Sequence, residues 1–198
     1  MTGSTGFIGK KLLLFLINKG YNVIDVIRRD EHYLQQVRKK YKKNYQTIIL
    51  KNNDSFKKIR QINPDFFLNL ATLYKKKYNQ KDLINLNNSN IVFPLKILNQ
   101  LKTEKINMIN FGTMMEYIKD NRNPTNVYTA SKVFFEEISN IFNFKNKYTI
   151  KFYETLDTMD TRDKIIPTIL KAHKRGGSIK ILDNLKLNFI TIDNIFEV

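Results

Sequence analysis

Residues 2–9 read TGSTGFIG and place three glycines at intervals of three, directly before the apolar run 12–17. A glycine turn that opens into a helix leaves unpaired backbone N–H groups at the positive end of the helix dipole, and such an end binds phosphate. Gly3 is expected to permit the tight turn, Gly6 the close approach of a ligand, and Gly9 the packing of helix on sheet. The stretch therefore predicts a dinucleotide-binding turn, with a glycine-rich loop that binds nothing as the alternative.

A tyrosine and a lysine stand four residues apart in the segment YTASK at 128–132, at the start of an apolar-periodic stretch. On a helix, Tyr128 and Lys132 share one face. The lysine charge favours the tyrosinate and lowers the pKa of the phenol from its usual value of about 10, as general acid–base catalysis requires. Upstream, residues 108–113 read as a buried strand that ends in Thr113, and ligands lie at strand carboxyl ends in α/β sheets.

Strand-like and helix-like segments alternate along the chain, which favours a parallel, doubly wound α/β sheet. We expect strands at 22–27, 47–50, 66–70, 106–111 and 148–152, and helices at 31–43, 55–62, 83–101, 127–144 and 164–175. Since the chain begins at the last residue of the first strand, the central strand of the 3-2-1-4-5-6 order is expected to be mostly missing. The chain is therefore interpreted as a fragment, or as a product whose start was assigned too late.

These motifs, in this order, resemble the extended short-chain dehydrogenase/reductase superfamily, in its nucleotide-sugar-modifying branch, the NAD-dependent epimerase/dehydratase family. The resemblance rests on the glycine turn, the segment DFFLNLAT at 65–72, Asn90, the Thr113, Tyr128 and Lys132 triad, and the segment FITID at 189–193. It implies a Rossmann-type NAD(P)-binding domain over residues 1–160. Residues 161–198 are then the start of a substrate-binding part that lacks its later elements.

The resemblance also assigns residues to the site. Thr113 would hold the substrate carbonyl, Tyr128 would donate the proton, and Lys132 would bind the nicotinamide ribose. The expected cofactor-binding residues are Gly3, Thr5, Gly6, Phe7, Ile8, Gly9, Arg28, Arg29, Asp54, Leu70, Ala71, Asn90, Tyr128 and Lys132. The expected substrate contacts are Thr72, Met114, Glu154 and Arg162.

Cofactor choice depends on the end of the second strand, where NAD enzymes place an acid and NADP enzymes an arginine. The acidic position falls on Ile27, and Arg28 and Arg29 follow. This favours NADP(H) over NAD(H). The alternative is that both arginines are loop charges and that Asp30 serves the ribose.

The two residues after Thr113 indicate the reaction type. The 4,6-dehydratases of the branch carry Asp-Glu there, whereas this chain has Met114 and Met115, which disfavours dehydration. The surrounding pattern is similar to CDP-abequose synthase-like 4-ketoreductases, and this implies NADPH-dependent reduction of a 4-keto nucleotide sugar in lipopolysaccharide O-antigen biosynthesis. The alternatives are an epimerase of the same family and an inactive fragment that only binds nucleotide.

The amino-acid composition indicates which binding partners to expect. The formal net charge is +16, but the lysines are dispersed and no nucleic-acid fold signature accompanies them, so a basic nucleic-acid-binding protein is the remote alternative. With no cysteine and two histidines, a metal site is not expected. No secretory signal or apolar run of 18 residues is present, so we expect a cytoplasmic protein without membrane contact. The resemblance further implies a homodimer through the helix at 83–101 and the catalytic helix.

Overall fold

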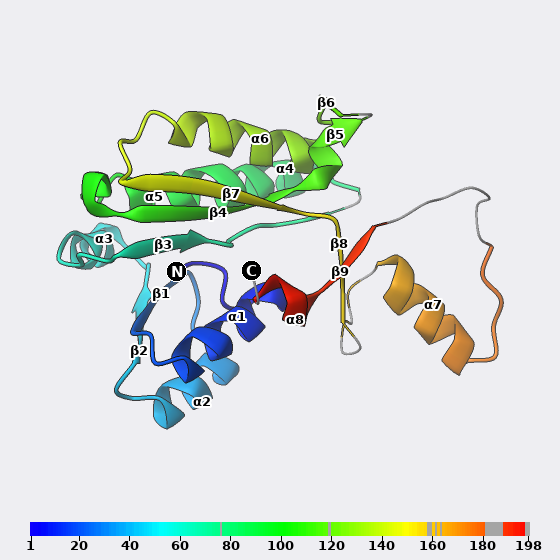
Figure 1. The fold of residues 1–198 in the computed structure, drawn as a ribbon, viewed down its shortest axis with the longest axis horizontal. Helices are drawn as coiled ribbons and strands as arrows, with labels where there is room; N and C mark the ends of the chain where they lie inside the picture. Colours follow the sequence, from blue (N-terminus) through cyan, green and yellow to red (C-terminus); the bar gives the residue numbers. More distant parts are fainter. Residues whose placement is uncertain are drawn as a thin grey trace. The chain divides into compact units, whose positions relative to one another are not determined.

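The computed structural model describes residues 1–75, 77–118, 120–157, 160, 162, 164–180 and 188–196 (Figure 1). The chain divides into two units, Met1–Lys151 and Phe152–Val198. The predicted domain boundary after residue 160 stays a prediction, and Thr161 lies outside the described residues.

Five strands form the sheet of the first unit: β1 (Val23–Ile27), β2 (Tyr45–Ile49), β3 (Phe66–Asn69), β4 (Asn107–Thr113) and β7 (Asn146–Phe152). β1 pairs with β2 and β3 pairs with β4, both in parallel, and β7 lies on the other side of β4. Each parallel pair is joined by a crossover through helices. The predicted alternation of strand and helix is confirmed.

The first two residues link the two halves of the sheet. Thr2 bridges Val26 of β1 and Asn69 of β3, in parallel with both. The Thr2 N–H donates to the Leu68 carbonyl at 2.9 Å, and the Val26 N–H donates to the Met1 carbonyl at 2.8 Å. The resulting order is β2, β1, the Met1–Thr2 link, β3, β4 and β7. It is the doubly wound order of a Rossmann-type sheet, with Thr2 at the expected end of the first strand.

Helices cover both faces of this sheet (Figure 1). α1 (Phe7–Asn18) and α2 (His32–Lys40) lie on one face, and α3 (Asn53–Arg60), α4 (Gln80–Asn87), α5 (Phe93–Leu98) and α6 (Val127–Ser139) lie on the other. On the second face, Phe67 and Met108 of the sheet pack against Ile59, Ile97 and Phe135 of α3, α5 and α6. This core fixes α6, which carries the predicted catalytic pair, against β4.

The helix predicted at 83–101 is interrupted. A π-helical turn, η1 (Asn88–Val92), separates α4 from α5. Pro94 has no N–H, so it cannot donate the usual helical hydrogen bond to the carbonyl of Asn90, and the helix widens just before it. The wide turn contains Asn90, which is buried.

The helix predicted at 127–144 is shorter than expected and ends at Ser139. Asn140 forms its C-cap, and the aromatic rings of Phe142 and Phe144 then pack against the core from an irregular segment. Their apolar character continued the helical pattern in the sequence, although it reflects packing of a loop.

Short elements before and after β4 complete the first unit. They are the 3-10 turns η2 (Thr103–Lys105) and η3 (Met114–Glu116) and the antiparallel hairpin of β5 (Tyr117–Ile118) and β6 (Asn121–Arg122).

The second unit contains β8 (Glu154–Leu156), α7 (Ile165–Lys174), β9 (Phe189–Thr191) and α8 (Ile192–Ile195). β8 and β9 pair in parallel. Asp193 lies in the first turn of α8, where Thr191 caps the helix. Among the residues that the structure describes, no helix is long and apolar enough to cross a membrane.

Candidate active site

The glycine turn is closely packed. Gly3 adopts a φ of +79°, and a Cβ there would lie 2.6 Å from the Ala71 backbone nitrogen. A Cβ on Gly9 would lie 2.0 Å from the Gly3 carbonyl oxygen, and one on Gly6 would lie 3.2 Å from the same atom. The turn can therefore approach β3 and α1 only because these positions have no side chain.

The turn leads directly into the amino end of α1. The Gly6 N–H donates to the Gly3 carbonyl at 2.9 Å, and Gly6 is the N-cap of α1. In the part of the chain that the structure describes, no side chain caps this end. Thr5, Phe7 and Ile8 lie on the turn and on the first turn of the helix, as their cofactor-binding prediction requires. A cradle of this kind fits the pyrophosphate of a dinucleotide.

A buried polar group behind the turn was not predicted. Asp25 of β1 accepts hydrogen bonds from the Ser4 hydroxyl and, at 3.1 Å, from the Tyr45 hydroxyl. Burial raises the pKa of the Asp25 carboxyl, and these hydrogen bonds and the Met1 amino group oppose the rise. The signal in the sequence was an acid inside the apolar strand VIDVI, but its partners lie about 20 residues away on either side.

The end of β1 carries the residues that were expected to choose the cofactor. Ile27 is 5% exposed and has no polar atom to offer a ribose, and the Arg28 guanidinium lies 5.6 Å from the centre of the Phe93 ring. Arg29 is exposed. Asp30, the alternative ribose contact, forms a bidentate salt bridge with Arg38, with N–O distances of 2.6 and 3.1 Å. This hydrogen bonding lowers the pKa of the Asp30 carboxyl.

Other predicted cofactor residues lie at the same edge of the sheet. Leu70 and Ala71 follow β3, are buried, and pack against Gly3. Thr72 comes next and is exposed. Asp54 lies in the first turn of α3, is exposed, and pairs with Lys57 at 2.6 Å.

The three predicted catalytic residues lie on β4 and α6, which pack together. Thr113 is the last residue of β4, is 6% exposed, and its hydroxyl oxygen accepts the Met115 N–H at 3.2 Å. Asn126 caps α6 through the Thr129 N–H at 2.9 Å, so Tyr128 lies in the first turn and Lys132 one turn further.

Lys132 is 5% exposed, and burial lowers the pKa of its ammonium to about 8, with the negative charge of Glu116 acting in the opposite direction. Tyr128 is half-buried, and its ring meets the ring of Tyr74 edge to face, with the centroids 5.0 Å apart. A buried cation one turn behind a phenol favours the tyrosinate. A pair of this kind is suited to general acid–base catalysis by the phenol.

Asn90 connects this helix to the segment after β3. Its amide oxygen accepts the Leu73 N–H at 2.6 Å, and its amide nitrogen donates to the Leu73 carbonyl at 3.1 Å and to the Ser131 hydroxyl at 2.9 Å. Ser131 in turn donates to the Tyr128 carbonyl at 2.7 Å. The structure thus gives Asn90 a part in holding α6, and its cofactor contact stays a prediction.

The predicted substrate residues fall in both units. Met114 follows Thr113 in η3 and is half-buried, while Met115 is 40% exposed. In the second unit, Glu154 pairs with Lys164 at 2.9 Å, and Arg162 pairs with Asp160 at 2.7 Å.

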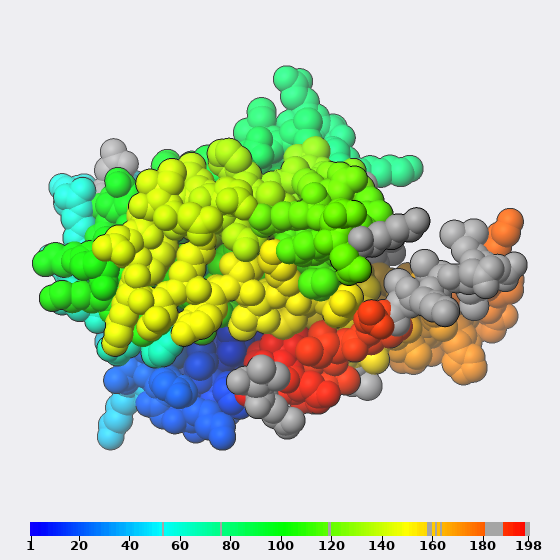
Figure 2. Space-filling model, turned by 45° about the horizontal axis from the view of Figure 1, so that its top comes forward, coloured from blue at the N-terminus to red at the C-terminus, as the bar shows by residue number. Residues whose placement is uncertain are grey.

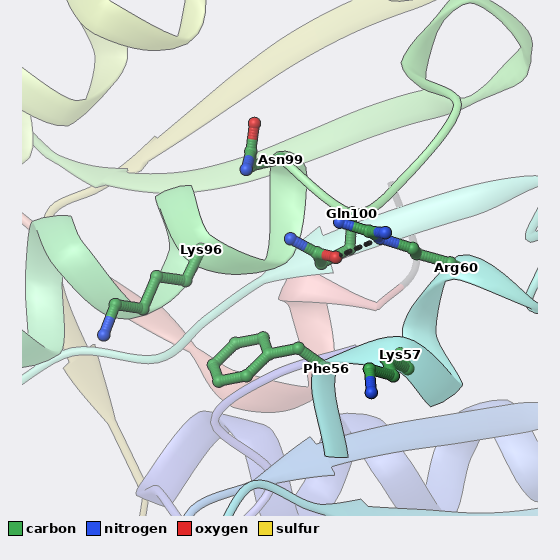
Figure 3. Close-up of a pocket in the computed structure, with 6 residues that line it drawn as sticks. All are labelled: Phe56, Lys57, Arg60, Lys96, Asn99 and Gln100. Atoms are coloured by element: carbon green, nitrogen blue, oxygen red, sulfur yellow. Dashed lines mark hydrogen bonds between the residues drawn. The ribbon is translucent and has the colours of Figure 1, made fainter. Parts of the chain in front are cut away.

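A separate hollow of about 300 Å³ lies between α3 and α5 and is lined by Phe56, Lys57, Arg60, Lys96, Asn99 and Gln100 (Figure 3). Arg60 donates to the Gln100 side chain at 2.5 Å across it. Most of these residues lie in the last turns before β3 and β4, toward the amino ends of those strands. Ligands of doubly wound sheets bind at the carboxyl ends, so this hollow is not the predicted site.

Fold and glycine turn together define a Rossmann-type α/β protein of the kind that binds dinucleotides. The chain belongs to the NAD dependent epimerase/dehydratase family, whose profile matches residues 1–192. This confirms the resemblance drawn from the sequence and places the chain among enzymes of the extended short-chain dehydrogenase/reductase type. None of the curated proteins matches the chain.

Solved structures agree with this fold. The chain is similar to UDP-glucuronic acid 4-epimerase from Bacillus cereus, in complex with UDP-glucuronic acid and NAD, at 19% identity and a TM-score of 0.77, over 98% of this chain and 69% of that one. It is similar to UDP-N-acetylglucosamine 4-epimerase from Methanobrevibacter ruminantium at 21% identity and a TM-score of 0.78, over 99% of this chain and 69% of that one. It is similar to UDP-glucose 4-epimerase from Thermotoga maritima at 17% identity and a TM-score of 0.76, over 99% of this chain and 70% of that one. At these identities the likeness is one of fold.

Proposed function

We propose that this protein is an NADP(H)-dependent oxidoreductase that reduces the 4-keto group of a nucleotide-linked sugar. The observation that carries the proposal is the position of Lys132, buried one turn behind Tyr128 on the helix that packs against the strand ending at Thr113. Family membership supports the class of enzyme, and the fold neighbours include proteins solved with nucleotide sugars.

The preference for NADP(H) is supported by the end of β1. A 2′-hydroxyl needs an acceptor, yet Ile27 provides none and the Asp30 carboxylate is engaged by Arg38. Two arginines at the same place, Arg28 and Arg29, suit a 2′-phosphate, because a guanidinium binds phosphate through paired hydrogen bonds.

In the proposed reaction the glycine turn and Lys132 would hold the nicotinamide cofactor, which would supply the hydride when bound. The Thr113 hydroxyl donates a hydrogen bond to the carbonyl oxygen of the sugar and orients it. Tyr128 gives its proton to the same oxygen, which becomes the new hydroxyl. Lys132 stabilises the tyrosinate that remains. Met114 and Met115 supply neither the acid nor the base that loss of water would need.

A 4-epimerase of the same family is the second candidate, favoured by the 4-epimerases among the similar structures. Epimerisation would need the same three residues. It differs because the hydride would first be taken from the sugar and then returned to the other face of the same sugar. Retention or release of the oxidised cofactor therefore separates the two reactions.

A panel of nucleotide-linked 4-keto sugars, incubated with NADPH and followed by the loss of absorbance of the reduced nicotinamide, tests the proposal. We expect stoichiometric oxidation of NADPH with at least one sugar. Conversion of a 4-hydroxy nucleotide sugar to its epimer, seen by NMR without net NADPH oxidation, would instead establish the epimerase. Absence of both reactions, with intact cofactor binding, would support the inactive fragment.

The homodimer also stays a proposal. Phe134 of α6 and Ile84 of α4 are 51% and 56% exposed, and the two helices cover the same face of the sheet (Figure 1). Large apolar side chains exposed on neighbouring helices are typical of an interface. A cytoplasmic location stays a prediction.

A further inference from the structure

A buried group of charges lies next to the catalytic triad. Glu116 ends η3, three residues after Thr113, and its side chain is 1% exposed. Its carboxylate pairs with the Lys151 ammonium of β7 and lies 3.6 Å from the Arg122 guanidinium of β6. Glu136 of α6 contacts the same two cations, at 3.3 Å from Lys151 and 2.6 Å from Arg122. We call these four residues the Glu116 cluster.

The Glu116 cluster reaches the catalytic helix along one face. Tyr128, Lys132 and Glu136 occur at intervals of four on α6, and residues so spaced share a helix face. Arg122 joins this face to the β5–β6 hairpin, which lies beside α6 in Figures 1 and 2. The cluster therefore fastens the segment after Thr113 to the helix that carries the other two members of the triad.

Local sequence makes room for the cluster. A Cβ on Gly112 would lie 3.0 Å from the Lys151 Cγ and 3.1 Å from the Thr149 Cγ2. Because Gly112 has no side chain, the stem of Lys151 lies across β4 and brings its ammonium to Glu116. The Lys151 ammonium also donates to the Tyr117 hydroxyl at 3.0 Å.

We propose that Glu116 is a positioning residue for Lys132, the buried negative charge that keeps the Lys132 ammonium charged and in place behind Tyr128. The inference rests on the proposed function for its catalytic consequence. A lysine as buried as Lys132 tends to lose its proton, and a neutral amine neither favours the tyrosinate nor attracts a ribose hydroxyl as strongly.

The direction of the effect is set by the charges around Lys132. Burial lowers the pKa of its ammonium, and Glu116 is the group that raises it. Among the described residues, other titratable groups on or against α6 are Arg122, Glu136 and Lys151 of the cluster, Tyr128 and Glu137 on the same helix, Lys147 of β7, and Tyr74 and Tyr78 from the segment after β3. Arg122 and Lys151 are cations, and both Glu116 and Glu136 pair with them.

The test measures the titration of Lys132 in the cofactor-free protein by NMR of ¹⁵N-labelled lysine side chains, with the resonance assigned by its loss in Lys132→Arg. Glu116→Gln keeps the shape of the side chain and removes its charge. We expect it to lower the Lys132 pKa by about one pH unit, the size expected on losing a nearby opposite charge. Glu137→Gln is the matched control, since Glu137 also pairs with Arg122 but is 58% exposed, and it should leave the Lys132 titration unchanged.

An unchanged Lys132 titration in Glu116→Gln, or an equal shift in Glu137→Gln, would overturn the inference. If the glutamine variant does not fold, Glu116→Asp decides. It withdraws the charge by one methylene and should lower the pKa by less, and an unchanged value would again overturn the inference. With an active sugar substrate, the alkaline limb of the kcat profile should move to lower pH in Glu116→Gln by the same amount. The titration needs neither cofactor nor sugar, so failure to find a substrate would count against the proposed function alone.

Discussion

Replacing Gly9 by alanine tests the packing of the glycine turn. The added Cβ would lie 2.0 Å from the Gly3 carbonyl oxygen, 2.7 Å from the Gly3 carbonyl carbon and 3.0 Å from the Ser4 Cα. All three are backbone atoms, so no side chain can rotate away. Since van der Waals contact begins at about 3.5 Å, the turn and α1 must separate by about 1.5 Å.

The magnitude combines three contributions. Overpacking of a tight site costs about 1–3 kcal/mol. Displacing Gly3 also weakens the hydrogen bond from the Gly6 N–H, worth about 0.5–1.5 kcal/mol. Alanine recovers about 1 kcal/mol because it favours the helix over glycine. The net loss is about 2 kcal/mol, which lowers the melting temperature of a chain of this size by about 4–8 °C.

The assay is thermal unfolding followed by circular dichroism, together with titration of NADPH fluorescence. Gly177→Ala is the control, because the nearest heavy atom to its added Cβ is the Ala172 carbonyl oxygen at 3.7 Å. We expect that control to melt within about 2 °C of the wild type and to bind NADPH normally, while Gly9→Ala binds it more weakly. A Gly9→Ala protein with wild-type melting and wild-type NADPH affinity would refute the reasoning.

Three further predictions concern other parts of the first unit. The double variant Arg28→Ala with Arg29→Ala should weaken NADPH by about 1.5–3 kcal/mol per lost charged hydrogen bond and spare NADH, as measured by fluorescence titration; equal weakening of both would make the arginines loop charges. Because burial lowers the Lys132 pKa from 10.5 to about 8, the folded protein holds a costly charge below pH 8. Lys132→Met should therefore be more stable at pH 7 by up to about 3 kcal/mol, an advantage that fades between about pH 8 and 10.5 in melting experiments, and a constant difference would contradict this. Phe134→Glu should turn a dimer into a monomer in light scattering, and a monomeric wild type would refute the proposed interface.

Much of the fold was predictable because its signals are local. The glycine spacing at 2–9, the apolar strands and the cap of α6 at Asn126 are each read within a few residues. Two of the predicted helices differ from the observed ones for a physical reason. Pro94 widens the long helix into a π-turn, and Phe142 supplies apolar character to a loop that packs on the core rather than to a helix.

The polar parts of the site were less predictable. Asp25 and Glu116 are buried acids whose partners lie far along the chain, at Ser4 and Tyr45 for the first and at Lys151 for the second. Only the folded sheet brings these groups together. The sequence could indicate an acid in an apolar context, but not the partner that stabilises its charge.

Turnover of NADPH by Tyr128→Phe, beside the wild type and with a nucleotide-linked 4-keto sugar, tests the central claim most directly. The phenylalanine lacks the proton that the reaction needs, whereas the dinucleotide is held largely by the backbone of the glycine turn. We expect a loss of kcat of about 100-fold or more, the lower end of what a general acid contributes, with the NADPH dissociation constant nearly unchanged. A Tyr128→Phe protein that retains most of the wild-type turnover would contradict the assignment of the active site.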